Sequence, residues 1–363
     1  MKINFIDLQA QYKKYEKEIN SEVLEVFASA QFIGGEKLNS LEKNLAVYTG
    51  AKHAIGCSSG TDALLLALMA LDVGVGDEVI TTPFTFIATA EVVALLGAKS
   101  VFVDIDEESY NIDPSKIEAA ITKKTKAIIP VSLYGQCADM KAINDIAKKH
   151  NITVIEDACQ SFGATYRGKK SCNLSTISCT SFFPSKPLGA YGDGGAIFTD
   201  NDELATKMRM LLNHGQNERY KHKYIGINGR LDAVQAAILN VKLKHFEEEV
   251  RLRDEIGSRY SDLLEDADVI TPNIADGNTS VYAQYSIRVK NREAMVEKLS
   301  ALGVPTAVHY PVPLHMQEAF KDLGYNIGDF PISELVSKEI MSLPMSAYLS
   351  EAEQDFVVQA IKG

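Results

Sequence analysis

The feature that most constrains this chain is an alternation of short β-branched runs with helical stretches between residues 54 and 200. Such alternation is typical of an α/β fold in which helices cover both faces of a mostly parallel sheet. Each run is close to the usual strand length of about five or six residues. The sequence predicts a seven-stranded sheet, with strands over 54–57, 78–81, 101–104, 127–133, 153–157, 179–183 and 196–199.

Helical patterns lie between these runs, for example over 62–71 and 140–150. A longer helical pattern, from Leu231 to about Glu265, is rich in Glu, Lys and Arg and is predicted to bridge two domains. After it the alternation resumes, with a strand expected over 281–289 and a loop over 305–313. We therefore predict a large domain over 1–245, including the N-terminal segment, and a small α+β domain over 246–363.

Composition and charge exclude several classes of protein. The formal charge is −11, and no block of Lys or Arg alternates with aromatic residues, so we expect no nucleic-acid partner. Asp7 stands where a secretory signal would be apolar, and no apolar run reaches membrane-spanning length. We expect a cytoplasmic protein with no membrane partner. The five cysteines are an odd number and form no C-x-x-C pair, which argues against a disulfide framework and against a structural zinc site. We expect reduced thiols and no metal.

The segment Cys57-Ser58-Ser59-Gly60-Thr61-Asp62 follows a predicted strand and begins a helix. Amides at a helix N-terminus are unpaired and the helix dipole favours negative charge there, while Gly60 lets an anion approach the backbone. A phosphate group could bind at this position. The alternative is an ordinary helix cap formed by a Ser or Thr side chain.

Two adjacent acids, Glu156 and Asp157, end the strand predicted over 153–157. Successive side chains of a strand face opposite ways, so the two carboxylates cannot form a catalytic pair. The one that faces the ligand edge of the sheet could keep a pyridine nitrogen protonated. A helix-capping acid is the alternative.

Lys186 lies in an apolar loop rich in Pro and Gly, Phe182-Phe183-Pro184-Ser185-Lys186-Pro187-Leu188-Gly189. Partial desolvation lowers the pKa of a lysine towards the range in which its free amine attacks carbonyl groups. The glycines at 192, 194 and 195 lack the P-loop spacing, so ATP chemistry is not indicated. A structural loop lysine is the alternative.

Taken together, these segments occur in a specific order: a phosphate site, an acid at a strand end, and a lysine 29 positions later (186 minus 157). With Pro83-Phe84-Thr85-Phe86, they resemble the DegT/DnrJ/EryC1/StrS family of sugar aminotransferases. The resemblance covers the whole chain, through the matching segments 5–8, 60–64, 156–160, 181–186 and 309–311. It implies the aspartate-aminotransferase fold, which is fold type I of the enzymes that use pyridoxal 5'-phosphate.

The resemblance also implies roles for individual residues. Lys186 would hold pyridoxal 5'-phosphate covalently and move the proton during catalysis. Asp157 would pair with the pyridine nitrogen, Gln160 would bond to the ring hydroxyl, and Phe86 would stack on the ring. The phosphate would be bound by Gly60, Thr61, Ser181 and, from the neighbouring subunit, Asn228. The active site would therefore be shared within a homodimer, the commonest soluble assembly.

The implied reaction moves an amino group from L-glutamate to a keto sugar carried by a nucleotide. His309 and Tyr310 would meet the sugar nucleotide, and Arg230 could bind a carboxylate or phosphate, although a structural role is an alternative for His309. Segments 129–139, 281–285 and 305–311 resemble members of the family that act on UDP-2-acetamido-2-deoxy-3-oxo-glucuronate. That substrate would place the enzyme in the synthesis of bacterial surface polysaccharide, such as the O-antigen of lipopolysaccharide.

Three alternatives stay open at this stage. One is an aminotransferase for a 4-keto-6-deoxy sugar nucleotide. Another is a different reaction on the same scaffold, such as sugar dehydration or amino-acid lyase activity. Dehydrases of this family carry His in place of the lysine, and this chain has Lys186. The third is a non-catalytic protein that binds a sugar nucleotide or regulates transcription. Fold alone does not separate these functions.

Overall fold

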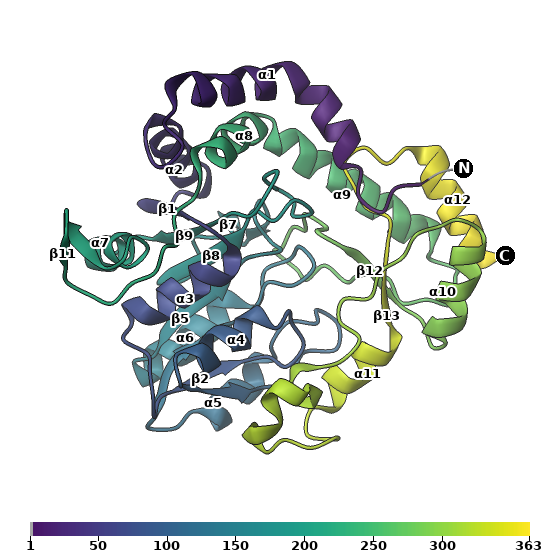
Figure 1. Ribbon diagram of the computed structural model, residues 1–363. Helices are drawn as coiled ribbons and strands as arrows, with labels where there is room; N and C mark the ends of the chain where they lie inside the picture. The colour runs from purple at the N-terminus through teal and green to yellow at the C-terminus, as the bar shows by residue number, and fades with distance from the viewer. Residues whose placement is uncertain (1–2) are drawn as a thin grey trace.

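The computed structural model describes residues 3–363 and contains a central seven-stranded sheet (Figure 1). Strand β9 runs antiparallel to both of its neighbours, and the other pairs are parallel. The predicted mostly parallel sheet is confirmed. Its order is β1 (His53–Cys57), β9 (Gly195–Thr199), β8 (Ile177–Ser181), β5 (Thr153–Asp157), β4 (Thr125–Ile128), β2 (Glu78–Thr81) and β3 (Lys99–Phe102).

Alternate side chains of the strands face two different helical layers. Ala127, Ile129 and Ile155 belong to a core shared with α3 (Gly60–Ala70), α4 (Ala88–Leu95) and α7 (Asp202–Leu211). Ile128 and Val154 face the other way, towards α5 (Pro114–Ala120) and α6 (Met140–His150). Both faces of the sheet are buried, which explains why the strands are apolar throughout.

Four helices lie at the end of the sheet formed by β1 and β9, where three of them share a core with Ala54, Ala196 and Phe198. They are α1 (Leu8–Ser29), α2 (Glu36–Thr49), α8 (Ala233–Lys244) and α9 (Phe246–Leu263), and α1 is the one outside that core. Helices α1 and α2 both pack on α8, and α9 then leads towards the C-terminal part of the chain (Figure 1). The helical pattern over 231–265 therefore forms two helices rather than one. They meet at His245, whose backbone is not helical and whose ring stacks on Tyr15 of α1, with 4.4 Å between centroids.

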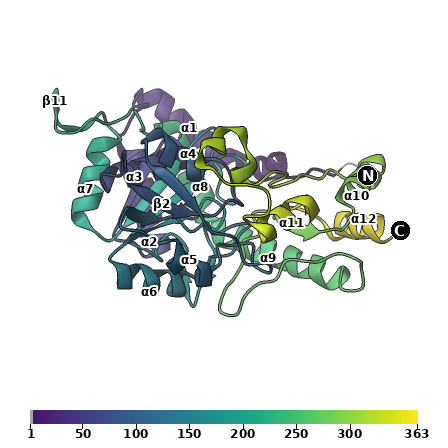
Figure 2. The ribbon, with the colours of Figure 1, turned by 90° about the horizontal axis from the view of Figure 1, so that it is seen from below.

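A second core is built mainly from the C-terminal part of the chain. Its strands are β12 (Tyr285–Arg288) and β13 (Ile340–Leu343), and its helices are α10 (Arg292–Ala301), α11 (Pro331–Glu339) and α12 (Glu351–Lys362). Ile3 packs in this core with Tyr260, Tyr285 and Met341, whereas Phe246 packs in a core under the large sheet. Figure 2 shows both chain ends beside α10 and α12. The domain boundary at residue 245 stays a prediction.

The segment between α10 and α11 returns to the edge of the large sheet. It contains two short 3-10 helices, η1 (Leu314–Met316) and η2 (Glu318–Leu323). The Leu314 amide donates to the Pro83 carbonyl at 2.8 Å, and the Tyr325 hydroxyl accepts from the Phe102 amide at 3.2 Å. The remaining strands form two small hairpins: β6 (Thr165–Tyr166) with β7 (Lys169–Lys170), and β10 (Gln216–Glu218) with β11 (Lys221–His222).

Across residues 3–363, no helix is both long enough and apolar enough to cross a membrane. All five cysteines carry free thiols, and four of them are buried. The same residues contain no group of three or more His, Cys, Asp or Glu side chains that could hold a metal ion.

Candidate active site

Asp157 lies at the C-terminal end of β5, where open α/β sheets bind ligands. Its side chain is buried, and each carboxylate oxygen accepts one hydrogen bond. Oδ2 accepts from the Thr89 hydroxyl at 2.8 Å, and Oδ1 accepts from the Cys159 amide at 3.2 Å. The carboxylate is thus fixed in orientation by the first turn of α4 (Ala88–Leu95) and by the turn that follows β5.

The preceding residue, Glu156, faces the other side of the strand and is fully buried. Its carboxyl group bonds with the hydroxyls of Ser171 and Ser178 at 2.8 and 3.0 Å and with the Cys172 amide at 3.1 Å. Burial raises the pKa of Glu156 to about 7, because the charged form is poorly solvated there. The two adjacent acids therefore occupy different environments, as strand alternation requires.

Lys186 lies in the irregular loop between β8 and β9. The loop folds back on itself, since a Cβ added to Gly189 would lie 2.4 Å from the Pro184 carbonyl oxygen. Burial lowers the pKa of Lys186, while Cys159 and Asp157 nearby act in the opposite direction. A lysine whose amine is partly desolvated beside a buried carboxylate has the properties of an amine nucleophile.

The start of α3 forms a cup beside the end of β8. The Ser59 side chain caps the helix, accepting from an amide of the first turn at 3.0 Å. A Cβ added to Gly60 would lie 2.7 Å from the Ser181 Cβ, and one added to Gly195 would lie 2.5 Å from the Ser59 carbonyl carbon. Thr61 follows as the second residue of the helix. The cup combines helix-terminal amides with hydroxyl groups, a combination that suits a phosphate.

The wall opposite the cup joins the end of β5 to the loop 305–313. Gln160 donates from Nε2 to the Tyr310 hydroxyl at 3.2 Å and accepts the Tyr134 amide at Oε1 at 2.9 Å. The Tyr134 hydroxyl donates to the His309 carbonyl, and His309 Nδ1 lies 3.0 Å from the Ser342 hydroxyl. These bonds bring the predicted residues Gln160, His309 and Tyr310 together.

Phe86 completes the group of aromatic and charged side chains. Its ring is 55% exposed, and its centroid lies 6.1 Å from that of Tyr310. Burial lowers the pKa of His309, and the positive charge of Lys186 lowers it further. Side chains from well-separated segments therefore lie close to one another around Tyr310.

Asn228 and Arg230 lie on the strip that follows the β10–β11 hairpin. Asn228 is exposed and bridges Asn213 in the backbone, and Arg230 donates from Nη1 to the Asn213 side chain at 2.7 Å. The strip runs beside the cup, since the Ser58 amide donates to the Gly229 carbonyl at 2.8 Å. Among residues 3–363, no side-chain hydrogen bond connects Asn228 or Arg230 to Lys186 or Asp157.

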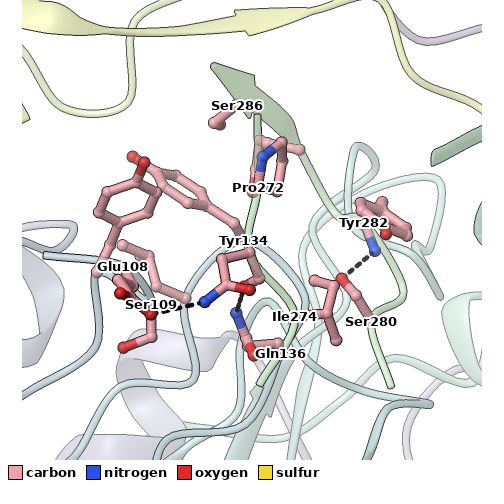
Figure 3. A pocket seen from close by; sticks show the side chains of 13 residues that line it. Glu108, Ser109, Tyr134, Gln136, Pro272, Ile274, Ser280, Tyr282 and Ser286 are labelled. Carbon is pink, nitrogen blue, oxygen red and sulfur yellow. Dashed lines mark hydrogen bonds between the residues drawn. The ribbon is translucent and has the colours of Figure 1, made fainter. Parts of the chain in front are cut away.

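A separate small hollow adjoins the site (Figure 3). It is lined by residues of the loops around 108–110, 133–136 and 272–286, and neither Lys186 nor Asp157 is among them. Tyr134 is common to both, because it lines the hollow and also bonds with Gln160 and His309. The hollow is therefore distinct from the site built around Lys186.

The sequence profile of the DegT/DnrJ/EryC1/StrS aminotransferase family matches residues 13–362. The chain belongs to this family. It is 55% identical over 359 residues to the UDP-2-acetamido-2-deoxy-3-oxo-D-glucuronate aminotransferase of Pseudomonas aeruginosa, a match that covers 99% of both chains. It is also 50% identical to a pleiotropic regulatory protein of Geobacillus stearothermophilus, over 99% of this chain and 98% of that one.

A solved structure of a Bacillus subtilis member with bound cofactor PMP matches with a TM-score of 0.93 and 34% identity, covering 99% of this chain and 84% of that one. Like other DegT/DnrJ/EryC1/StrS proteins, this chain is a pyridoxal-phosphate-dependent aminotransferase with the aspartate-aminotransferase-like fold. Its residues fit the cofactor. A buried lysine lies near enough to a buried carboxylate for the carboxylate to raise the pKa of the lysine, and the glycine at position 60 keeps open a cup that a Cβ would fill.

Two residues of this site have no counterpart in the sequence-based predictions. Thr89, which orients Asp157, lies in an apolar helix 68 positions earlier and carries no local signal. Tyr134, which ties Gln160 to the loop of His309, has a left-handed backbone with φ 56° and is followed by Gly135. The Tyr-Gly pair could have indicated a turn, but only the fold shows what the turn touches.

Proposed function

We propose that this enzyme transfers an amino group from L-glutamate to UDP-2-acetamido-2-deoxy-3-oxo-glucuronate. The observation that carries this proposal is the 55% identity, over 99% of both chains, to the Pseudomonas aeruginosa aminotransferase named for that substrate. We further propose that it acts in the cytoplasm, in the synthesis of bacterial surface polysaccharide such as O-antigen.

In the proposed mechanism, bound pyridoxal phosphate supplies an aldehyde and an electron-withdrawing pyridinium ring. Asp157 would hold the ring nitrogen protonated, because its carboxylate is buried and kept in place by Thr89 and Cys159. The Lys186 amine would hold the cofactor and would carry the proton that amino transfer moves between carbon atoms. Phe86, whose side chain is 55% exposed, would cover one face of the pyridine ring.

The other cofactor contacts follow from the cup and the wall. Gly60, Thr61 and Ser181 bind the phosphate at the start of α3. Gln160 bonds to the ring hydroxyl. One amide hydrogen of Gln160 is used for Tyr310, and an amide has two, so a second donor remains for this bond.

Substrate binding is assigned to Arg230, His309 and Tyr310. The Arg230 Nε atom is buried and has no hydrogen-bond partner within residues 3–363, so it can take up an oxygen of a carboxylate or phosphate. A uronic acid supplies such a carboxylate on its sugar ring. His309 would meet the sugar in its neutral form, because burial and Lys186 both lower its pKa.

We propose a homodimer with a shared active site, in which Asn228 contributes to the phosphate site of the partner. Support comes from the exposure of Asn228 and of two large side chains: Ile225 on the same strip, at 91%, and Tyr220 in the turn of the β10–β11 hairpin, at 79%. Large exposed apolar side chains grouped on a surface are typical of interaction sites.

The test is a panel of keto-sugar nucleotides incubated with the enzyme, pyridoxal phosphate and L-glutamate, with products identified by mass spectrometry. We expect a mass change corresponding to exchange of a keto oxygen for an amino group, fastest with the 3-oxo-glucuronate. A clear preference for a 4-keto-6-deoxy sugar would replace the substrate but keep the aminotransferase. Loss of water without amination would replace the reaction by dehydration.

A second candidate, a regulatory role, is favoured by the 50% identity to the Geobacillus stearothermophilus protein named as a pleiotropic regulator. The same panel separates the two functions. Binding of a sugar nucleotide without turnover of any member of the panel would support regulation, whereas turnover establishes catalysis.

A further inference from the structure

Helix α8 presents two polar side chains to the loop that carries Lys186. Gln235 and Lys242 are seven positions apart (242 minus 235), which places them on the same face of the helix, two turns from each other. The facing segment, residues 184–192, contains no helix or strand of its own. Its conformation must therefore be fixed by contacts with its surroundings.

Gln235 bonds to the end of this loop through both ends of its amide. Its Oε1 accepts from the Tyr191 amide at 2.9 Å, and its Nε2 lies 3.4 Å from the Tyr191 carbonyl oxygen as a donor. A Cβ added to Gly192 would lie 2.8 Å from Gln235 Nε2, so the contact is close. The amide of Gln235 thus takes the place of a backbone pairing partner for Tyr191.

Lys242 holds the loop closer to Lys186. It is only 2% exposed, and its ammonium donates to the Gly189 carbonyl and lies 4.8 Å from the centroid of the Tyr191 ring. Lysine is almost never fully buried unless its charge is paired. Here two groups of the loop contact the ammonium: the Gly189 carbonyl and the face of the Tyr191 ring.

A buried acid on α9 balances the charge of Lys242 from behind. Burial lowers the pKa of Lys242 to about 8, and Glu249, 2% exposed, acts against that decrease. Glu249 in turn accepts from Gln11 of α1 at 2.8 Å and from the Tyr348 hydroxyl at 2.6 Å. The ammonium is therefore bonded to the loop and lies within the electrostatic influence of the Glu249 carboxylate, which Arg253 partly offsets.

We propose that Gln235 and Lys242 are positioning residues, which clamp the loop 184–192 to α8 so that the Lys186 amine faces Asp157. The inference rests on the role of Lys186 in the proposed function and deepens it. Neither residue touches the reacting atoms. They act on the chemistry by fixing the backbone from which Lys186 projects.

The first experiment measures amide hydrogen exchange by mass spectrometry on the full chain, with pyridoxal phosphate bound and after its removal. In Lys242→Met and Gln235→Leu, peptides covering 184–192 should exchange about tenfold faster than in the unmodified protein, since a hydrogen bond that closes the loop is lost. Peptides of β5 and β8 should keep their protection. Lys244→Met is the matched control, because Lys244 lies on the same helix and is exposed.

The second experiment measures how fast Lys186 captures pyridoxal phosphate. Visible absorbance follows the reaction, and borohydride reduction with peptide mass spectrometry locates the modified lysine. We expect about tenfold slower capture in Lys242→Met and no change in Lys244→Met, with circular dichroism melting as the measure of global stability. If neither the variants nor the unmodified protein formed the adduct between Lys186 and pyridoxal phosphate, the proposed function would fail. The hydrogen-exchange data would still test whether Gln235 and Lys242 hold the loop.

Unchanged exchange of 184–192 in both variants would overturn the proposal. So would faster exchange throughout the chain to the same degree, because that reports general destabilisation rather than a loosened loop. If Lys242→Met is not recovered in folded form, Gln235→Leu decides alone, since Gln235 is only half-buried and its loss removes the other half of the clamp.

Discussion

The two faces of strand β5 carry adjacent acidic residues, Asp157 and Glu156, in different environments. On one face, Asp157 lies near Lys186, and each of its oxygens accepts one hydrogen bond. On the other, the carboxyl group of Glu156 is closed in by three donors and has no exposed surface. The residues are adjacent, and the direction of the side chain alone separates them.

The difference shows that neighbouring residues of one strand can have separate roles. The Asp157 carboxylate, at the edge where ligands bind, can still accept hydrogen bonds from a further partner. The Glu156 carboxyl group already bonds to three donors and so stabilises the chain around it. Charge changes at Asp157 should therefore appear in activity, and charge changes at Glu156 should appear in stability.

The largest effect on the active face is expected at Lys186. Lys186→Ala should lower the rate of amino transfer by about 10⁴-fold or more, because it removes the group that moves the proton. Its melting temperature should stay within about 4 °C of the unmodified value. Rapid-mixing measurement of the glutamate half-reaction gives the rate, and retention of more than a tenth of the activity would rule out Lys186 as the catalytic amine.

Asp157→Asn should come next. The substitution keeps the shape of the side chain but removes the charge that stabilises a protonated ring nitrogen, so the rate should fall by about 10²- to 10³-fold. The measurement is the same half-reaction. A rate within about threefold of the unmodified enzyme, once the cofactor is shown to be bound, would mean that Asp157 does not face the ring nitrogen.

Glu156→Gln is the matched substitution on the other face, and it should leave the rate within about twofold. The raised pKa of Glu156, about 7, means that its contribution to stability is present below its ordinary value of 4.5 and is lost as the pH rises through about 7. Between these limits the variant should gain up to about 3 kcal/mol relative to the unmodified protein. Urea unfolding across this pH range measures the gain, and parallel curves would contradict it.

His309 should give the smallest effect. Its pKa is lowered by burial and then by Lys186, so the folded state disfavours its protonation. Stability should therefore decrease as the pH falls below the ordinary histidine value of about 6.5. In His309→Asn this decrease should be absent. An acid limb of the stability curve that is identical in both proteins would show that His309 titrates freely.

Much of this architecture could be predicted from the sequence. Each of the seven predicted strands overlaps an observed one, although β3 and β8 begin and end two residues earlier than predicted, and the helix predicted over 140–150 coincides with α6. The strand predicted over 127–133 ends earlier, at Ile128, because Pro130 follows and has no amide hydrogen for the ladder. The strand predicted over 281–289 is reduced to Tyr285–Arg288, since Val281 instead donates to the Gly135 carbonyl and Tyr282 has φ 40°.

The sequence predicts which residues form the site, but not the residues that hold them in place. Lys186, Asp157 and Gly60 stand in segments whose order along the chain carries the information. Thr89, Tyr134 and Glu249 act through contacts between residues far apart in sequence, and local patterns contain no trace of these. Lys242 could be noticed in the sequence, because it is a lysine next to Ile238, Leu239 and Val241 in an apolar helix. The group that it contacts could not be predicted.

The placement of Ile3 constrains how the molecule can be made. Ile3 leaves the ribosome before the residues at 256–361 that surround it, and helix α1 precedes α8, on which it lies. The apolar side of α1 therefore stays uncovered until α8 has been synthesised, and Ile3 is buried only after the last third of the sequence has been translated. Until then this apolar surface is exposed on the nascent chain, and exposed apolar surface favours aggregation.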